Sequence, residues 1–343
     1  MSVALYRKYR PQDFASVKDQ DHIVTVLKGA IEKAQIPHAL LFAGGRGTGK
    51  TTLARIFARE IGASDVDIYE IDAASNRGID DIRELREAVQ TVPYESPYKV
   101  YIIDEVHMLT KEAFNALLKT LEEPPAHVVF VLATTEEEKL LDTIRSRCQV
   151  FRFRSPSQVV LEQTVQEVAH AEGYQLTNDA AHLIALAADG SFRDALGVTQ
   201  KVLLASGDTV GSVDEVAAII GAPRQETVQA FLEALAQRDI KAALTAIDSA
   251  VKNHSDMQLF IRVILEDVRT AVLARYGSEA ATTAIAGDTK KATFLKDLAE
   301  NQVKTINSHT IKHLLAAAER VGKSPIPHLP LEVAAMELTE AKA

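Results

Sequence analysis

Residues 44–51 read Gly-Gly-Arg-Gly-Thr-Gly-Lys-Thr and match the pattern G-x-x-x-x-G-K-[S/T] in full. Glycines in such a loop let backbone N–H groups converge on a phosphate without a clash from Cβ atoms. Lys50 is expected to reach the β- and γ-phosphates of a nucleotide, and the Thr51 hydroxyl to bind Mg²⁺. The residues expected to bind the nucleotide here are Gly44, Gly45, Arg46, Gly47, Thr48, Gly49, Lys50, Thr51 and Thr52.

Two carboxylates, Asp104 and Glu105, follow an apolar run at 100–103. At the end of a strand beside the phosphate loop, Asp104 would hold Mg²⁺ together with Thr51, and Glu105 would orient an attacking water. The alternative is an acidic pair that precedes the helix expected from Lys111. The Asp-Glu pair favours ATP hydrolysis, and the chain has no Asn-Lys-x-Asp pattern for reading guanine.

Polar and basic residues stand at three further element ends. Thr134 and Thr135 end an apolar run, where one could touch the γ-phosphate, or they could cap a helix. Arg147 is either a solvated surface residue or an arginine finger that stabilises charge developing on a neighbour's γ-phosphate. Arg193 begins a helical pattern, and a surface position is the simpler interpretation for it.

These residues need elements to position them. Up to about residue 155, short apolar runs alternate with helical patterns, which predicts an α/β domain with a parallel sheet covered on both faces. Strands are expected at 39–42, 68–72, 100–104, 128–133 and 149–153. Helices are expected at 51–61, 80–90, 111–121 and 138–145. The ligand should lie beyond the carboxyl ends of the strands.

The rest of the chain predicts helices only. Helical patterns at 161–172, 179–188 and 193–205 precede a Gly-Asp turn at 207–208. Amphipathic helices follow through 213–320, with a looser connection around 277–289 and a last helix from Leu331. The expected domains are 1–155, 156–208 and 209–343.

Composition bounds the function further. The 343 residues, 47% of them hydrophobic, are enough for two or three domains with buried cores. A net charge of −9 argues against non-specific coating of nucleic acid, so any DNA contact must come from a few placed groups. The single cysteine, Cys148, excludes an internal disulfide framework and a cysteine-based zinc module. No apolar run of 18 residues and no signal peptide is visible, so a cytoplasmic, nucleoid-associated protein is expected.

Seven segments in a fixed order give the chain a family resemblance. They lie at 6–11, 44–51, 70–78, 104–109, 117–124, 146–148 and 190–196. Together they closely resemble the ATPase subunits (gamma/tau) of the bacterial DNA polymerase III clamp loader, which are AAA+ proteins. The resemblance is dense over residues 1–200 and diffuse beyond. It implies a AAA+ P-loop domain, a small helical lid domain and an all-helical collar that joins subunits into a ring or spiral.

The resemblance also implies roles for single residues in the nucleotide site. Arg10 and Pro11, with the neighbourhood of residues 22–24, would flank the adenine. Thr135, or else Thr134, would be the first sensor of the γ-phosphate. Arg193 would be the second sensor, acting in cis from the lid. Arg147 would be the finger supplied in trans to the next subunit.

DNA contacts follow from the same resemblance. Backbone amides and short polar side chains of Asn76, Arg77, Gly78 and Thr143 would track DNA phosphates without reading bases. For Arg77, a surface position at a helix start is the alternative.

The implied function is that of an ATPase within the DNA polymerase III holoenzyme, which uses ATP and Mg²⁺ to open a sliding clamp and load it onto primer–template DNA. Its partners would be the delta and delta-prime subunits, copies of itself, the clamp and DNA, with no membrane. One alternative is a non-catalytic structural subunit of the clamp loader, against which the intact Lys50, Thr51, Asp104 and Glu105 argue. Another is a different AAA+ DNA-remodelling ATPase, against which the segments at 104–109 and 146–148 argue.

The chain departs from the family pattern at one internal position. Most relatives carry a four-cysteine zinc module between the phosphate-loop helix and the segment at 70–78, whereas residues 59–67 bridge that gap directly here. No zinc is therefore expected. Cys148 is expected to be a small buried hydrophobe, and His22, His38 and His107 to be structural. The extension with which longer relatives hold the polymerase and helicase is not expected in this chain.

Overall fold

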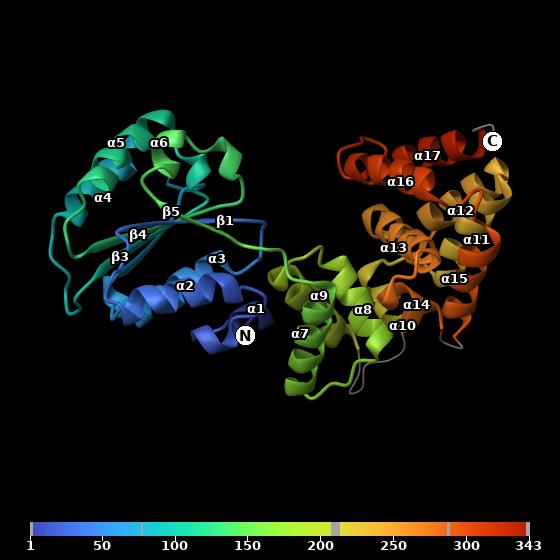
Figure 1. Cartoon of the computed structure of the whole chain (residues 1–343), viewed down its shortest axis with the longest axis horizontal. Helices are drawn as coiled ribbons and strands as arrows, with labels where there is room; N and C mark the ends of the chain where they lie inside the picture. The colour runs from blue at the N-terminus through green and yellow to red at the C-terminus, as the bar shows by residue number, and fades with distance from the viewer. Residues whose placement is uncertain (1–2, 77, 207–212, 287–288, 341–343) are drawn as a thin grey trace. The chain divides into compact units, whose positions relative to one another are not determined.

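The computed structural model describes residues 3–76, 78–206, 213–286 and 289–340. The chain divides into two compact units (Figure 1). Unit 1 comprises residues 1–173 and 188–200, and unit 2 comprises residues 174–187 and 201–343. The division into three domains at 155 and 208 stays a prediction, and the expected turn at 207–208 lies outside the described residues.

The core of unit 1 is a five-stranded parallel sheet, as the sequence predicted. The strands are β1 (Ala39–Ala43), β2 (Ile68–Asp72), β3 (Lys99–Asp104), β4 (Val128–Thr134) and β5 (Gln149–Arg152). Their spatial order is β2-β3-β4-β1-β5, so β4 lies between β1 and β3. All three of these strands end at the same edge of the sheet, which is therefore where their following loops meet.

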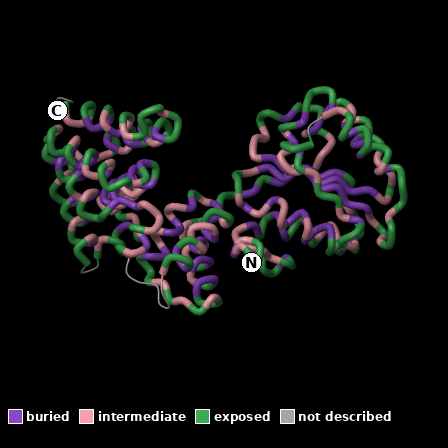
Figure 2. The backbone as a smooth tube through the Cα atoms, turned by 180° about the vertical axis from the view of Figure 1, so that it is seen from behind, coloured by how far each residue is buried: buried purple, intermediate pink, exposed green. Residues whose placement is uncertain are grey.

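Helices cover both faces of this sheet because alternate side chains of each strand point to opposite sides. Leu40 and Phe42 of β1 pack on α2 (Asp21–Glu32) and α3 (Lys50–Glu60). Leu41 points to the other face, which α4 (Ile79–Val89), α5 (Lys111–Glu122) and α6 (Asp142–Arg145) cover. Strands β1 and β4 are buried along their whole length, and the sheet is largely buried in the interior of unit 1 (Figure 2).

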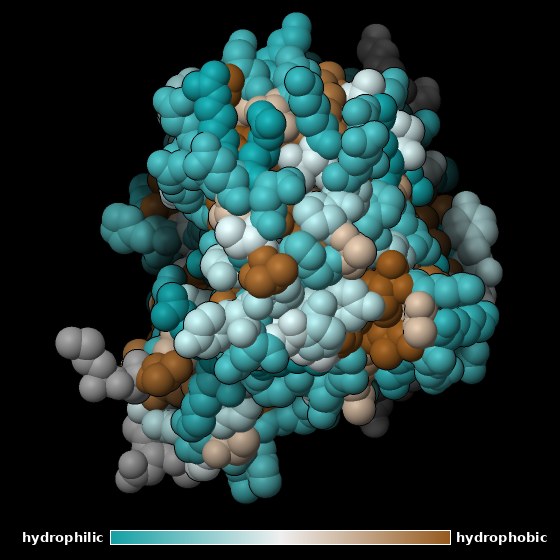
Figure 3. Space-filling view, turned by 90° about the vertical axis from the view of Figure 1, so that its left-hand side faces the viewer, coloured by the Kyte–Doolittle hydropathy of each residue, from teal (hydrophilic) through white to brown (hydrophobic). Residues whose placement is uncertain are grey.

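Short elements complete unit 1. They are α1 (Leu5–Lys8), the 3₁₀ turns η1 (Phe14–Ser16), η2 (Asp65–Asp67), η3 (Val106–Met108) and η4 (Glu137–Lys139), then α7 (Gln158–Ala171) and the first part of α9 (Phe192–Ala205). The surface at the left of Figure 1 is largely hydrophilic, with hydrophobic side chains in small separate groups (Figure 3).

Unit 2 is all helical in its described part, as predicted. Its helices are α8 (Asn178–Ala187), α10 (Val213–Ile220), α11 (Gln225–Gln237), α12 (Ile240–Lys252), α13 (Met257–Arg275), α14 (Glu279–Ile285), α15 (Lys290–Asn301), α16 (Ser308–Val321) and α17 (Leu329–Glu340). The long α13 runs through the core, where Phe260 meets Phe231 of α11 edge to face with ring centroids 6.0 Å apart. No helix among the described residues is long and apolar enough to span a membrane.

Two local predictions were wrong. The helix expected at 138–145 is interrupted, because Leu140 and Leu141 adopt extended backbone between η4 and α6. Leu140, in the extended pair, and Ile144 of α6 are both buried in the core on this face of the sheet. The looser connection expected at 277–289 contains a further helix, α14, which side-chain periodicity over so short a stretch did not reveal.

Candidate nucleotide site

The phosphate loop joins β1 to α3 and needs glycine at several of its positions. Gly47 has φ +69°, and a Cβ there would lie only 1.9 Å from Ser191 Oγ at the start of α9. Gly49 has φ +101° and forms the N-cap of α3 in left-handed backbone. A side chain at either residue would be strained, so the sequence pattern and the backbone agree. The backbone N–H groups of the loop therefore lie beside the N-terminus of α3, where binding of an anion is favourable.

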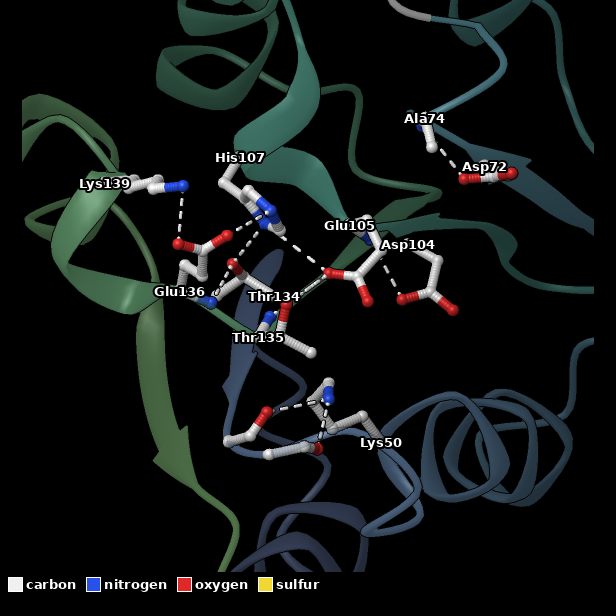
Figure 4. Close-up of polar contacts among 12 residues, drawn as sticks. Lys50, Asp72, Ala74, Asp104, Glu105, His107, Thr134, Thr135, Glu136 and Lys139 are labelled. Atoms are coloured by element: carbon white, nitrogen blue, oxygen red, sulfur yellow. Dashed lines mark hydrogen bonds and ion pairs between the residues drawn. The ribbon is translucent and has the colours of Figure 1, made fainter. Parts of the chain in front are cut away.

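Lys50 is buried, with 6% of its surface exposed, and folds back over the loop (Figure 4). Its Nζ donates to Gly44 O at 2.8 Å and to Gly45 O at 2.7 Å. Burial lowers the pKa of this ammonium, while Glu105 and Asp104 act in the opposite direction. Neutral carbonyls are weaker partners for an ammonium than phosphate oxygens, so the side chain is free to exchange them for a phosphate.

Thr51 and Asp104 form a pair that fits Mg²⁺. Thr51 Oγ1 donates to Asp104 Oδ2 at 2.8 Å, and the other oxygen of Asp104 accepts from Glu105 N at 2.9 Å. A hydroxyl and a carboxylate oxygen so close together supply two hard ligands of the kind that Mg²⁺ prefers, with phosphate and water completing its shell. Among the described residues no group of three or more His, Cys, Asp or Glu side chains could hold a metal ion.

Glu105 stands on strained backbone and touches Thr135. Its φ is +48°, in the left-handed region that non-glycine residues rarely adopt. Glu105 Oε2 accepts from Thr135 Oγ1 at 2.9 Å and from Thr135 N at 3.2 Å. The ends of β3 and β4 thus bring together a carboxylate and a hydroxyl that are 30 residues apart in the sequence (Figure 4).

The neighbouring Thr134 faces a different residue, His107, which the sequence analysis interpreted only as structural. Thr134 is buried, and its Oγ1 lies 2.9 Å from His107 Nδ1. His107 Nδ1 also lies 3.5 Å from Glu105 Oε2, and its Nε2 lies 3.3 Å from Glu136 Oε1. Of the two threonines, Thr135 is therefore the one that faces Glu105. The position of His107, two residues after the carboxylate pair, was the only hint in the sequence that it contacts Glu105 and Thr134. The direction of its side chain depends on the 3₁₀ turn η3, which the sequence did not predict.

A cavity of about 850 Å³ adjoins the loop and gathers residues from distant parts of unit 1. Most residues predicted for the nucleotide line it, and those shared with the prediction are Arg10, Pro11, Arg46, Gly47, Thr48, Gly49, Lys50, Thr51, Thr52, Asp104, Glu105 and Arg193. Ile23 and Val24, expected near the adenine, lie in the core instead. Val17, Val168 and Leu196 supply apolar wall to which the sequence analysis gave no nucleotide-binding role, although Leu196 ends the segment at 190–196.

Arg193 and Arg147 occupy different surroundings. The Arg193 guanidinium lies over the Tyr6 ring, 5.2 Å from its centroid, at the wall of the cavity. Arg147 is not part of that wall. Its guanidinium donates to Thr143 O at 2.7 Å and pairs with Glu122 at 2.5 Å.

Burial raises the pKa of the adjacent Cys148 thiol to about 11, so this cysteine behaves as a half-buried hydrophobe.

The described residues among those expected to contact DNA do not form one site. Arg77 lies outside the described residues. The Gly78 amide, at the N-cap of α4, already donates to Asp81 Oδ2 at 3.0 Å. Asn76 bonds back to Asp72, and Thr143 lies exposed in the four-residue helix α6. A carboxylate at the start of α4 disfavours a phosphate there unless Asp81 moves, so the predicted contacts stay predictions.

The fold and the site together define a class. A phosphate loop after β1, a carboxylate pair after β3 and polar residues after β4 of a 2-3-4-1-5 parallel sheet make up a AAA+ ATPase-type unit. The solved Holliday junction branch migration motor RuvB of Thermotoga maritima is similar over 66% of this chain and 79% of that one, with a TM-score of 0.54 and 21% identity. A solved point mutant of the same RuvB gives a TM-score of 0.53 at 21% identity over the same shares. These similarities show the fold alone.

Family models narrow the class. Residues 60–157 match the model described as DNA polymerase III, delta subunit, and residues 160–207 match the ATPase lid domain of DNA polymerase III clamp loader subunits. Residues 212–343 match domain III of the DNA polymerase III subunits gamma and tau.

Individual relatives agree with the family models. The tau subunit of Bacillus subtilis is 40% identical over 274 residues, which are 74% of this chain and 48% of that protein. The gamma/tau subunit of Mycobacterium tuberculosis is 36% identical over 306 residues, 82% of this chain and 53% of that protein. The chain belongs to the gamma/tau family of DNA polymerase III clamp-loader subunits, as its motifs predicted. It spans about half the length of the curated relatives it matches.

Proposed function

We propose that this chain is the ATPase subunit of a bacterial clamp loader, in which ATP binding and hydrolysis drive the opening of a sliding clamp and its loading onto primer–template DNA. One observation carries the proposal. The Thr51–Asp104 pair and the Glu105–Thr135 pair meet at the same edge of the sheet, beside Lys50. A metal-binding pair, a water-orienting carboxylate and a phosphate-binding ammonium are the set that ATP hydrolysis needs.

The chain's own residues supply binding and orientation. Lys50 would exchange the Gly44 and Gly45 carbonyls for phosphate oxygens. Thr51 and Asp104 would hold Mg²⁺, whose charge would offset that of the transferring phosphate. Glu105 has to leave Thr135 to reach a water in line with the γ-phosphate. A γ-phosphate that engages the Thr135 hydroxyl would release the carboxylate, so Thr135 is proposed as the sensor.

Completion of the site by a second subunit is part of the proposal. Arg147 lies outside the wall of its own nucleotide cavity, held by Glu122 and Thr143 O. A guanidinium so placed would serve a neighbour's γ-phosphate rather than its own. We accordingly propose assembly with delta, delta-prime and further copies of this chain, together with the clamp and DNA as partners, in the cytoplasm. DNA contact at residues 76–78 and 143 belongs to the same proposal.

Reconstitution with partner subunits, a sliding clamp and primer–template DNA tests the function. Clamp loading should require ATP, and Glu105→Gln should allow ATP-dependent clamp opening while slowing hydrolysis at least about 10²-fold. Glu300→Gln, the same chemical change at an exposed residue of α15, is the control and should behave as the unchanged protein.

The same assay separates the two alternatives. A non-catalytic structural subunit would support loading equally well with Glu105→Gln or Lys50→Ala in every copy of this chain. A different DNA-remodelling ATPase would hydrolyse ATP with DNA but leave the clamp unloaded. Either result would contradict the proposed function.

A further inference from the structure

A second cavity of unit 1, about 540 Å³ in volume, is lined by four arginines and one glutamine. Arg7 belongs to α1, Arg10 and Gln12 follow it, and Arg55 and Arg59 lie one turn apart on α3. The first three also line the nucleotide cavity, whereas Arg55 and Arg59 do not. The two cavities therefore share a wall, and no sequence motif pointed to the second one.

The charges around this cavity are not balanced within the chain. Arg55 pairs with Glu70, and Arg59 Nε lies 2.9 Å from Asp65 Oδ1. Across residues 3–76, 78–206, 213–286 and 289–340, no carboxylate lies within ion-pair distance of Arg7 or Arg10. Four guanidinium groups thus face one cavity with two carboxylate partners.

The charge of Arg10 is disfavoured by its surroundings. It is half-buried, and burial followed by repulsion from Arg55 lowers the pKa of its guanidinium, against which Glu70 acts. A guanidinium nevertheless stays protonated in proteins, so the repulsion persists as an unfavourable interaction. An anion that joined the cavity would relieve it.

The lining also limits what kind of anion fits. Among the residues that the structure describes, those lining the cavity are arginines and one glutamine, with no apolar or aromatic side chain to hold a nucleobase. Arginine forks match phosphate oxygens two at a time. The Gln12 amide is already engaged, since its Oε1 accepts from Arg59 Nη1 at 3.1 Å and its Nε2 donates to Arg10 O at 2.8 Å, so the arginines are the groups that would bind the anion. A small, highly charged phosphate group suits these walls better than a nucleoside or a hydrophobic peptide.

We propose that this arginine cluster is a second anion site, which binds a small phosphate-bearing anion in addition to the nucleotide held by the phosphate loop. Its occupant neutralises Arg7 and Arg10, which are also walls of the nucleotide cavity. Binding at the two cavities is therefore coupled, and each ligand changes the affinity of the other by the same factor. The proposal goes beyond the proposed function, since it requires neither hydrolysis nor DNA.

Calorimetry on the full chain tests the site with inorganic pyrophosphate as the probe. The phosphate loop is first saturated with a non-hydrolysable ATP analogue, so that pyrophosphate reports only a further site. We expect one additional site, weakened at least about 10-fold in the double variant Arg55→Gln, Arg59→Gln, since charge-assisted hydrogen bonds are lost. The matched control is Arg83→Gln, Arg86→Gln, two arginines of α4 outside both cavities.

Two further measurements keep the result clear. Lys50→Ala, which is expected to disable the phosphate loop, should retain the additional pyrophosphate site, and thermal melting should show that each variant folds. Absence of pyrophosphate binding with the loop filled would overturn the proposal, as would equal binding by the two double variants. Binding of a short oligonucleotide in place of pyrophosphate would also overturn it, because the site would then serve nucleic acid. None of these results depends on clamp loading.

Discussion

Unit 1 and unit 2 each contain a lysine that bonds polar groups within its own unit. The partners of Lys50 in unit 1 are neutral carbonyls, whereas the partner of Lys291 in unit 2 is a carboxylate. In unit 1, Lys50 bonds only neutral carbonyls, and burial lowers its pKa. In unit 2, Lys291 Nζ lies 2.9 Å from Asp267 Oδ1, and although burial lowers its pKa, attraction to Asp267 outweighs this and raises it. The difference suggests that Lys50 is kept available for a ligand, whereas Lys291 compensates a buried carboxylate. Variants of unit 1 site residues should therefore lose activity, and variants of the unit 2 pair should lose stability.

Arg147 should show the largest effect on activity. Arg147→Ala should leave ATP binding intact but reduce DNA-stimulated hydrolysis in the assembled loader about 10³-fold, because an arginine finger stabilises transition-state charge. Steady-state ATPase assays of the complex measure this. Arg145→Ala, which removes a nearby arginine paired with Asp142, is the control. Normal turnover with Arg147→Ala would disprove the assignment in trans.

Lys50→Ala should weaken ATP binding at least about 100-fold, because a charge-assisted contact to phosphate is lost. Titration with a fluorescent ATP analogue measures the affinity. Without nucleotide, the melting temperature should change little, since the carbonyl partners remain accessible to water. The exposed Lys33→Ala is the control. A large loss of stability would show that Lys50 is a structural lysine like Lys291, which would remove the contrast between the units.

Lys291→Met should lower the free energy of unfolding by about 3 kcal/mol, because Asp267, only 4% exposed, would be left buried without its partner. Burial already raises the pKa of Asp267, against the attraction of Lys291. Denaturant titration measures the loss, and ATP binding should be unchanged. Lys290→Met removes the adjacent exposed lysine and should be neutral. Adding Asp267→Asn to Lys291→Met should recover part of the stability, and a further loss instead would contradict the prediction.

Asp67 should give the smallest effect, and it sharpens the comparison because it lies in unit 1 yet behaves structurally. Although burial alone would raise its pKa, hydrogen bonds from Ser96 Oγ and from the amides of Tyr94 and Glu95 lower it to about 2. This carboxylate therefore stabilises the fold above pH about 4, and the contribution disappears as the pH falls toward 2.

Asp67→Asn should accordingly lose about 2 kcal/mol at pH 7. In denaturant titrations, the difference in unfolding free energy between the variant and the unchanged protein should disappear as the pH falls from about 4 to about 2. Asp65→Asn, two residues away and exposed, is the control. If the difference in unfolding free energy between the two proteins did not change with pH, the charge of the Asp67 carboxylate would not be what stabilises the loop 94–96.

The order of motifs predicted the fold of unit 1 well because each motif ties a residue type to a strand end. Gly47 and Gly49 have to be glycine, and the carboxylate pair has to follow a buried strand. The phosphate loop and the carboxylate pair could therefore be recognised from residue type and position in the sequence alone. The interrupted helix at 138–145 was not visible, since the burial of Leu140 and Ile144 depends on where the sheet lies. In unit 2, periodicity predicted helices, but the pairing of Asp267 with Lys291 depends on how α13 and α15 pack.

By itself, the sequence determined the phosphate loop, the Asp104–Glu105 pair, the helical second half and the family. Those features depend on residue type and local spacing, which a chain carries without folding. Only the tertiary structure decided that Thr135, rather than Thr134, faces Glu105, that His107 touches this network, and that four arginines share one cavity. Such contacts join residues tens of positions apart, and their side-chain directions are fixed by packing on both faces of the sheet rather than by any local pattern.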